Sequence, residues 1–126
     1  MTKQRLIFVV DDDAMYREML DLYLSDNPLN KVKSFPTGEE CLKHLTEAPD
    51  YIILDYKLDG VDKHAADGIK ILDKIRKKDW HTRVIMLSKH GQYNTALKSI
   101  EKGAEMYVIK DAHAFQKIDE LMEQLW

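Results

Sequence analysis

Five short apolar segments recur along the 126-residue chain, and they constrain its fold more than any other feature. They occupy residues 6–10, 32–35, 51–54, 84–87 and 106–109, the second being the weakest. Most of these segments are continuously apolar rather than alternating, as strands that are buried on both faces should be. The sequence therefore predicts five strands that lie largely inside the protein.

Segments with a helical period of apolar residues alternate with these strands. Thr37 and Glu40 form a capping box at the start of the second such segment, and Gly103 ends the fourth. Each apolar stripe is expected to face the core, and the methionines need no cofactor to explain them. The stripes are Met15, Met19, Leu22 and Tyr23; Leu42 and Leu45; Ile69, Leu72 and Ile75; Ala96, Leu97 and Ile100; and Phe115, Ile118, Leu121, Met122 and Leu125.

Alternation of five strands with five helices predicts an α/β fold. Short crossovers between the strands imply a doubly wound five-stranded parallel sheet with the strand order 2-1-3-4-5, as in flavodoxin-like proteins. No segment has the composition of a linker or a repeat, so residues 1–126 are expected to form one domain. Ligands of such sheets bind beyond the carboxyl ends of the strands.

Composition argues against several classes of protein. The 19 basic and 22 acidic residues give a net charge of -3, whereas a nucleic-acid-binding domain normally has a basic excess. The single cysteine, Cys41, excludes an internal disulfide and a cysteine-based zinc site, and we expect it to be a small buried residue. The longest apolar run near the N-terminus is too short for a signal peptide or a membrane span. We expect a cytoplasmic protein without membrane or direct nucleic-acid contacts.

Polar side chains follow four of the predicted strands. They are Asp11, Asp12 and Asp13 after the first strand, Asp55 after the third, Ser88 after the fourth and Lys110 after the fifth. Asp13 is expected to be only the N-cap of the next helix. Carboxylates packed together cannot all stay charged without a cation, and Mg²⁺ prefers oxygen ligands. Such an ion would offset the charge of a phosphoryl group moving to a carboxylate, and an ammonium group would pair with the product.

Four motifs at these strand ends carry a resemblance to a known family. They are Val9-Val10-Asp11-Asp12, Ile53-Leu54-Asp55, Met86-Leu87-Ser88 and Tyr107-Val108-Ile109-Lys110, with Gly103-Ala104 before the last strand. Taken in this order, they resemble the receiver domain of two-component response regulators, the CheY-like family. The resemblance extends over essentially the whole chain.

The resemblance implies a phosphoacceptor and a metal site. Asp55 corresponds to the nucleophile that takes a phosphoryl group from the phosphohistidine of a sensor histidine kinase or phosphotransfer protein. Asp11 and Asp12 correspond to the acidic pair that holds Mg²⁺, for which Mn²⁺ is an expected substitute. Asp55 itself and the backbone carbonyl of Lys57 would complete the set of protein ligands.

The resemblance also implies which residues respond to phosphorylation and which surface binds the output partner. Ser88 and Tyr107 correspond to the switch pair, and Lys110 to the lysine that pairs with the phosphoryl group. Lys57 and His90 stand where the family varies the rates of phosphorylation and dephosphorylation. The output partner is expected to bind the face of the fourth helix, fifth strand and fifth helix. A phosphorylation-dependent dimer is a separate expectation. Because segment 92–102 is polar apart from four residues, contacts there are expected to be mainly polar.

Two segments depart from the family pattern. Residues 58–67 form a longer loop than usual after Asp55, and we hypothesise that its acidic residues tune metal access or partner choice. Asp111 follows Lys110 where the family usually has a proline with a cis bond. A cis bond before a non-proline residue costs about 3–4 kcal/mol, so the Lys110–Asp111 bond is expected to be trans.

Three other functions are alternatives to a phosphorylated receiver domain. A pseudo-receiver would share the fold and bind partners without phosphorylation. A nucleotide or flavin binder would need a Ser/Thr/Gly-rich loop after the first strand, where three aspartates stand instead. A turnover enzyme, such as an aspartyl-phosphate phosphatase, would need its own substrate pocket and acid/base. We therefore expect a signalling domain rather than an enzyme, with only intrinsic phosphotransfer and autodephosphorylation.

Overall fold

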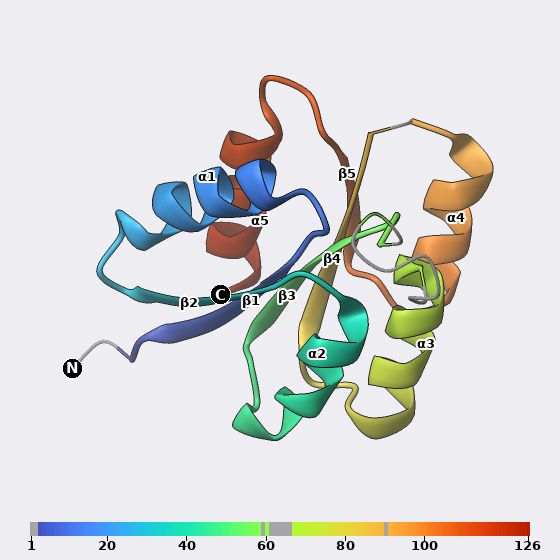
Figure 1. Ribbon diagram of the computed structural model, residues 1–126, viewed down its shortest axis with the longest axis horizontal. Helices are drawn as coiled ribbons and strands as arrows, with labels where there is room; N and C mark the ends of the chain where they lie inside the picture. Colours follow the sequence, from blue (N-terminus) through green and yellow to red (C-terminus); the bar gives the residue numbers. More distant parts are fainter. Residues whose placement is uncertain (1–2, 59, 61–66, 90) are drawn as a thin grey trace.

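The computed structural model describes residues 3–58, 60, 67–89 and 91–126. Within them, five parallel strands alternate with five α-helices, and the strand order β2-β1-β3-β4-β5 confirms the predicted topology (Figure 1). The elements are β1 (Arg5–Val10), α1 (Ala14–Ser25), β2 (Asn30–Phe35), α2 (Gly38–Lys43), a 3-10 turn (Leu45–Glu47), β3 (Tyr51–Asp55), α3 (Gly68–Lys78), β4 (Arg83–Ser88), α4 (Tyr93–Glu101), β5 (Met106–Ile109) and α5 (Ala114–Leu125).

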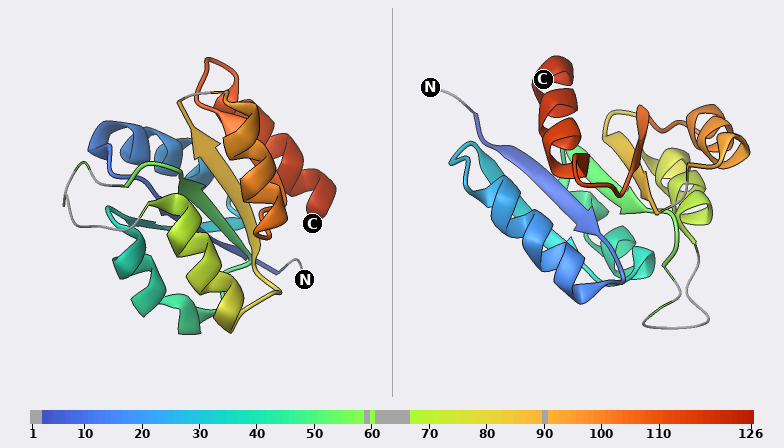
Figure 2. Two further views of the ribbon diagram at one scale, coloured as in Figure 1. Left: turned by 90° about the vertical axis from the view of Figure 1, so that its right-hand side faces the viewer. Right: turned by 90° about the horizontal axis from the view of Figure 1, so that it is seen from above.

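The sheet is sandwiched between two layers of helices. Helices α1 and α5 cover one face, and α2, α3 and α4 cover the other (Figure 2). Alternate residues of β1 point to opposite layers, so Ile7 and Val9 pack towards α1 and α5, whereas Phe8 and Val10 pack towards α2 and α3. The edge strands β2 and β5 are only partly buried, which explains the weaker apolar character of residues 32–35.

The register of the sheet brings the carboxyl ends of its inner strands to one edge. Leu54 of β3 pairs with Val10 of β1, and Asp55 pairs with Leu87 of β4. Ser88 pairs in turn with Ile109 of β5. The polar residues at these strand ends therefore have to lie side by side.

Helix ends follow the predicted signals. The Asp13 carboxylate accepts hydrogen bonds from two backbone amides of the first turn of α1, and the Thr37 hydroxyl accepts one from Glu40 N. After α4, Gly103 has a φ of 112°, a backbone conformation that residues with a side chain rarely adopt. A Cβ atom at Gly103 would also lie 2.8 Å from Nε of Arg76. This glycine therefore ends α4 as predicted.

Helix α1 buries a different face from the predicted one. Met15, Met19, Leu22 and Tyr23 are all exposed, Met15 to 72% of its surface. The residues of α1 that enter the core are Leu20 and Leu24, one helical turn apart. Apolar residues occur on more than one side of this helix, so their period alone could not select the side that meets the sheet.

Helix α4 also differs from the prediction. Leu97 and Ile100 are exposed, Ala96 is half-buried, and Ser99 is the residue of α4 that is fully buried. The Ser99 hydroxyl donates to the carbonyl oxygen of Thr95 at 2.8 Å, so it can be buried without losing a hydrogen bond. Helix α4, which contacts the edge strand β5, thus turns the small Ser99 side chain inwards, and its larger apolar side chains remain exposed to solvent.

Two expectations from composition concern burial. Cys41 is fully buried on α2, as predicted, and burial raises the pKa of its thiol to about 12. Among the described residues, none of the helices combines the length and the apolar character that crossing a bilayer requires.

The apolar stripes of α3 and α5 are confirmed, because Ile69, Leu72, Ile75, Ile118 and Met122 are buried.

The assignment of the core face of α1 predicts a contrast between neighbouring residues. We expect Leu20→Ala to lower the free energy of unfolding by about 3 kcal/mol, because it leaves a cavity in the core. Met19→Ala should change it by less than about 0.5 kcal/mol, because that side chain is exposed. Urea denaturation of the two variants measures the difference, and equal losses would contradict the assignment.

Candidate functional site

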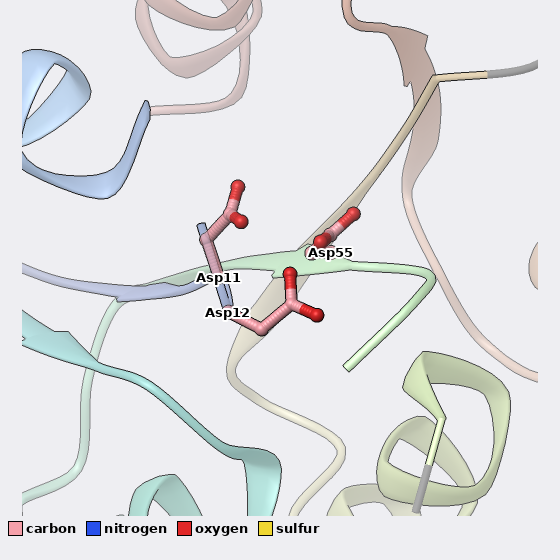
Figure 3. Close-up of side chains that lie close together, drawn as sticks. All are labelled: Asp11, Asp12 and Asp55. Carbon is pink, nitrogen blue, oxygen red and sulfur yellow. The ribbon is translucent and has the colours of Figure 1, made fainter. Parts of the chain in front are cut away.

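Three carboxylates meet at the carboxyl edge of the sheet. Asp11 and Asp12 follow β1, and Asp55 is the last residue of β3 (Figure 3). Each offers an oxygen atom, and these three oxygens lie within 4.8 Å of one another. Asp11 and Asp55 are buried, whereas Asp12 is half-buried. The structure thus brings together the three acidic side chains that the sequence predicts to be metal ligands.

The ammonium group of Lys110 lies between two of these carboxylates. Its Nζ atom is 2.8 Å from Oδ2 of Asp11 and 3.4 Å from Oδ2 of Asp55, and its side chain is only 4% exposed. The backbone N–H of Lys110 donates to the carbonyl oxygen of Ser88 at 2.8 Å, which continues the pairing of β4 with β5. The Lys110–Asp111 bond is trans, as expected.

One ammonium group does not balance the negative charge of this cluster. Burial, together with the charge of Asp11, raises the pKa of Asp55 to about 8, although Lys110 works in the opposite direction. Burial also opposes the charged form of Lys110, but its contacts with Asp11 and Asp55 raise its pKa above the ordinary value. The cluster therefore holds a firmly protonated lysine and a carboxylate whose ionisation is unfavourable.

The chemistry of the donor set fits a hard divalent cation. Three carboxylate oxygens lie close together, and a further positive charge would offset the burial and the repulsion by Asp11 that raise the pKa of Asp55. A pocket of about 480 Å³ opens onto the cluster, so water and a small anion can reach it. The pocket is lined by Asp12, Asp55, Tyr56, Lys57, Gly60, Ser88 and Lys89.

The remaining predicted site residues take different places. Ser88 is buried at the end of β4 and lines the pocket, as does the exposed Lys57. Tyr107 is half-buried on β5, in register with Met86, and packs against the core on the side of α2 and α3. His90 lies outside the described residues, as do residue 59 and residues 61–66 of the long loop.

Three contacts at the site were not predicted from the sequence. Gly60 N donates to Oδ2 of Asp12 at 2.7 Å, and a guanidinium nitrogen of Arg17 donates to the carbonyl oxygen of Asp11 at 2.7 Å. The ring of Tyr16 lies 4.4 Å from Nζ of Lys110. Tyr16 and Arg17 stand on the first turn of α1, and the N-cap at Asp13 was the signal that could have placed them near the site.

The raised pKa of Asp55 predicts a pH-dependent gain in stability for Asp55→Asn. Its ordinary pKa is 3.8, so as the pH rises from about 4 towards 8 this carboxyl group ionises in the unfolded chain but not yet in the folded one, and the folded state loses stability. Replacing this ionisable group by a neutral amide should raise the free energy of unfolding by about 2 kcal/mol at pH 7.5 in EDTA, and by little at pH 4.

Urea denaturation at the two pH values tests this prediction. Asp13→Asn is the matched control, because Asp13 is exposed and asparagine also caps helices. The control should match the wild-type protein at both pH values. A loss of stability in Asp55→Asn at pH 7.5 would mean that its pairing with Lys110 outweighs the repulsion.

Comparison with known proteins gives the same family along nearly the whole chain. Residues 7–124 match the family model of the response regulator receiver domain. The chemotaxis protein CheY of Listeria monocytogenes is 29% identical over 116 residues, which are 91% of this chain and 93% of that protein. The transcriptional regulatory protein ResD of Bacillus subtilis is 32% identical over 110 residues, which are 86% of this chain and 43% of ResD.

Solved structures agree with the sequence comparisons. The BeF3-activated DrrB receiver domain superposes with a TM-score of 0.82 at 30% identity, and the match covers 97% of both chains. A CheY-like receiver domain protein from Methanospirillum hungatei has a TM-score of 0.84 at 22% identity, which bears on the fold alone. The matched proteins thus include a chemotaxis protein of similar length and a longer transcriptional regulator.

Proposed function

This chain belongs to the response regulator receiver family, and on that premise we propose that Asp55 accepts a phosphoryl group from a phosphohistidine. The donor is a sensor histidine kinase or a phosphotransfer protein in the cytoplasm. The observation that carries the proposal is the cluster of Asp11, Asp12 and Asp55 around the Lys110 ammonium, beneath an open pocket. No turnover of a separate substrate is proposed, only intrinsic phosphotransfer and autodephosphorylation.

In the proposed reaction, an oxygen of Asp55 attacks the phosphorus atom of the phosphohistidine. The P–N bond breaks, and its electron pair leaves with the imidazole of the donor. Asp11, Asp12, Asp55 and the backbone carbonyl of Lys57 would hold Mg²⁺, with Mn²⁺ as a substitute. When bound, this ion offsets the negative charge of the phosphoryl group and favours the ionised form of Asp55. Lys110 lies within reach of the same group as a fixed positive charge.

Phosphorylation would then change the balance of charge at the ends of β4 and β5. The phosphoryl group brings roughly 1.5 to 2 negative charges and three acceptor oxygens. We propose that Ser88 and Lys110 contact these oxygens, and that Tyr107 responds to the movement of Ser88. Lys57 and His90 would adjust how fast the group arrives and leaves. Ser88 ends β4 and Lys110 follows β5, so their movement would change the adjoining surface formed by α4, β5 and α5.

The output surface in this proposal is the face of α4, β5 and α5. The sequence suggested mainly polar contacts there, but the structure exposes several large apolar side chains on it. They are Tyr93, Leu97, Ile100, Met106 and Ile109. A hollow of about 340 Å³ between β5 and α5 adjoins this group. We therefore propose that a protein partner, or a second phosphorylated copy of the chain, binds here largely through apolar contacts.

A second exposed apolar surface is proposed to receive the phosphodonor protein. Met15 and Met19 are exposed on α1, and α1 begins directly after the acidic residues of the site. Methionine side chains are flexible, so they adapt to the surface of a partner. A protein that delivers its phosphohistidine to Asp55 would approach close to the start of α1, because α1 begins soon after Asp12, which lines the pocket.

The proposed phosphorylation is tested by intact mass. The wild-type protein, incubated with acetyl phosphate and Mg²⁺, should gain one phosphoryl group, and EDTA should prevent the gain. Asp55→Ala should gain none, because it lacks the nucleophile, whereas Asp13→Asn should behave as the wild type does. A wild-type protein that gains no mass would contradict the proposal and favour a pseudo-receiver.

The proposed output face is tested by the size of the protein in solution. Beryllofluoride with Mg²⁺, an analogue of the phosphorylated site, should shift the wild-type protein towards a dimer in analytical ultracentrifugation. Ile100→Glu should prevent the shift, because it places a charge among the exposed apolar residues of this face. Met19→Glu is the matched control on α1 and should leave the shift unchanged. The reverse pattern would assign the dimer to α1 instead.

A further inference from the structure

The aromatic ring of Tyr16 lies against the ammonium group of Lys110. The distance from Nζ of Lys110 to the centre of the ring is 4.4 Å, well within the range of a cation–π contact. The ammonium group is almost completely buried, and Tyr16 is half-buried on the first turn of α1. In such a position water competes little for the lysine, so the attraction between ring and cation is stronger than at a surface.

The position of the ring is set by packing between α1 and α5. The ring of Phe115 meets that of Tyr16 edge to face, with 5.3 Å between the centres and an interplanar angle of 74°. Phe115 is in turn 5.4 Å from the ring of Tyr23. The buried hydroxyl of Tyr16 makes no hydrogen bond to any described residue. The contact between Tyr16 and the site is therefore made by the ring rather than by the hydroxyl.

Lys110 needs support on the side that the carboxylates do not cover. Asp11 holds its ammonium group at 2.8 Å, whereas Asp55 is more distant at 3.4 Å. Without a third contact, the flexible side chain could follow Asp11 and leave the phosphoacceptor. A ring face attracts the cation without using an oxygen of Asp55, so it leaves that carboxylate available for reaction.

We propose that Tyr16 is a positioning residue whose ring holds the Lys110 ammonium group where it can pair with a phosphoryl group on Asp55. This inference deepens the proposed function and rests on it. It assigns to α1 a part in the site beyond its N-cap and its core contacts. A purely structural role for Tyr16, as a spacer between α1 and α5, makes a different prediction for conservative substitutions.

Three variants separate the two roles. Tyr16→Phe keeps the ring and removes only the unpartnered hydroxyl, whereas Tyr16→Leu removes the ring. Tyr23→Leu is the matched control, because it removes a ring of the same aromatic cluster that packs on Phe115. The affinity for beryllofluoride in the presence of Mg²⁺ should fall about tenfold in Tyr16→Leu. It should stay within about twofold of the wild type in Tyr16→Phe and Tyr23→Leu.

Proton NMR provides a readout that does not depend on phosphorylation. The ε-methylene protons of Lys110 should be shifted upfield by the ring in the wild type, in Tyr16→Phe and in Tyr23→Leu. The shift should disappear in Tyr16→Leu. Unchanged Lys110 shifts together with unchanged beryllofluoride affinity in Tyr16→Leu would overturn the positioning role alone. A wild-type protein that binds no beryllofluoride and gains no phosphoryl group would instead overturn the proposed function.

Discussion

The contacts of Lys110 with Asp11 and Asp55 are the interaction on which the rest of this structure depends. They place one buried cation beside two of the three clustered carboxylates, so a single positive charge faces three acidic groups. Burial of Asp55 and the negative charge of Asp11 still raise the pKa of Asp55 to about 8. A site of this kind favours a divalent cation and is sensitive to any new negative charge.

The sheet explains how a local change of charge could reach distant surfaces. Asp55 ends the central strand β3 and Asp11 follows the neighbouring strand β1, whereas Ser88 ends β4 and Lys110 follows β5. The two polar groups proposed to follow the phosphoryl group thus lie on the side of the sheet that carries the α4–β5–α5 face. Tyr16 connects the same site to α1, whose methionines Met15 and Met19 are exposed. In the proposed function, donor and output proteins therefore meet different surfaces.

Some of the site could be predicted and some could not, for identifiable reasons. Asp11, Asp12, Asp55 and Lys110 were predicted because each follows an apolar strand, and the ends of parallel strands must meet. Gly60 and Tyr16 were missed because neither directly follows a strand, so the meeting of strand ends does not bring them to Asp12 and Lys110. No local pattern encodes such a contact.

The strands, their parallel order, the helix caps and the acidic cluster could be predicted from the amino-acid sequence, because they follow from local apolar runs, capping residues and short crossovers. The buried sides of α1 and α4, in contrast, depend on how the whole chain packs. Leu20 and Leu24 face the sheet while Met19 does not, and Ser99 is buried while Leu97 is exposed. Helix α1 carries apolar residues on more than one side, and the single apolar stripe of α4 is largely exposed, so burial depends on how each helix is rotated against its neighbours. That rotation is set by packing across the whole sheet, which no single segment specifies.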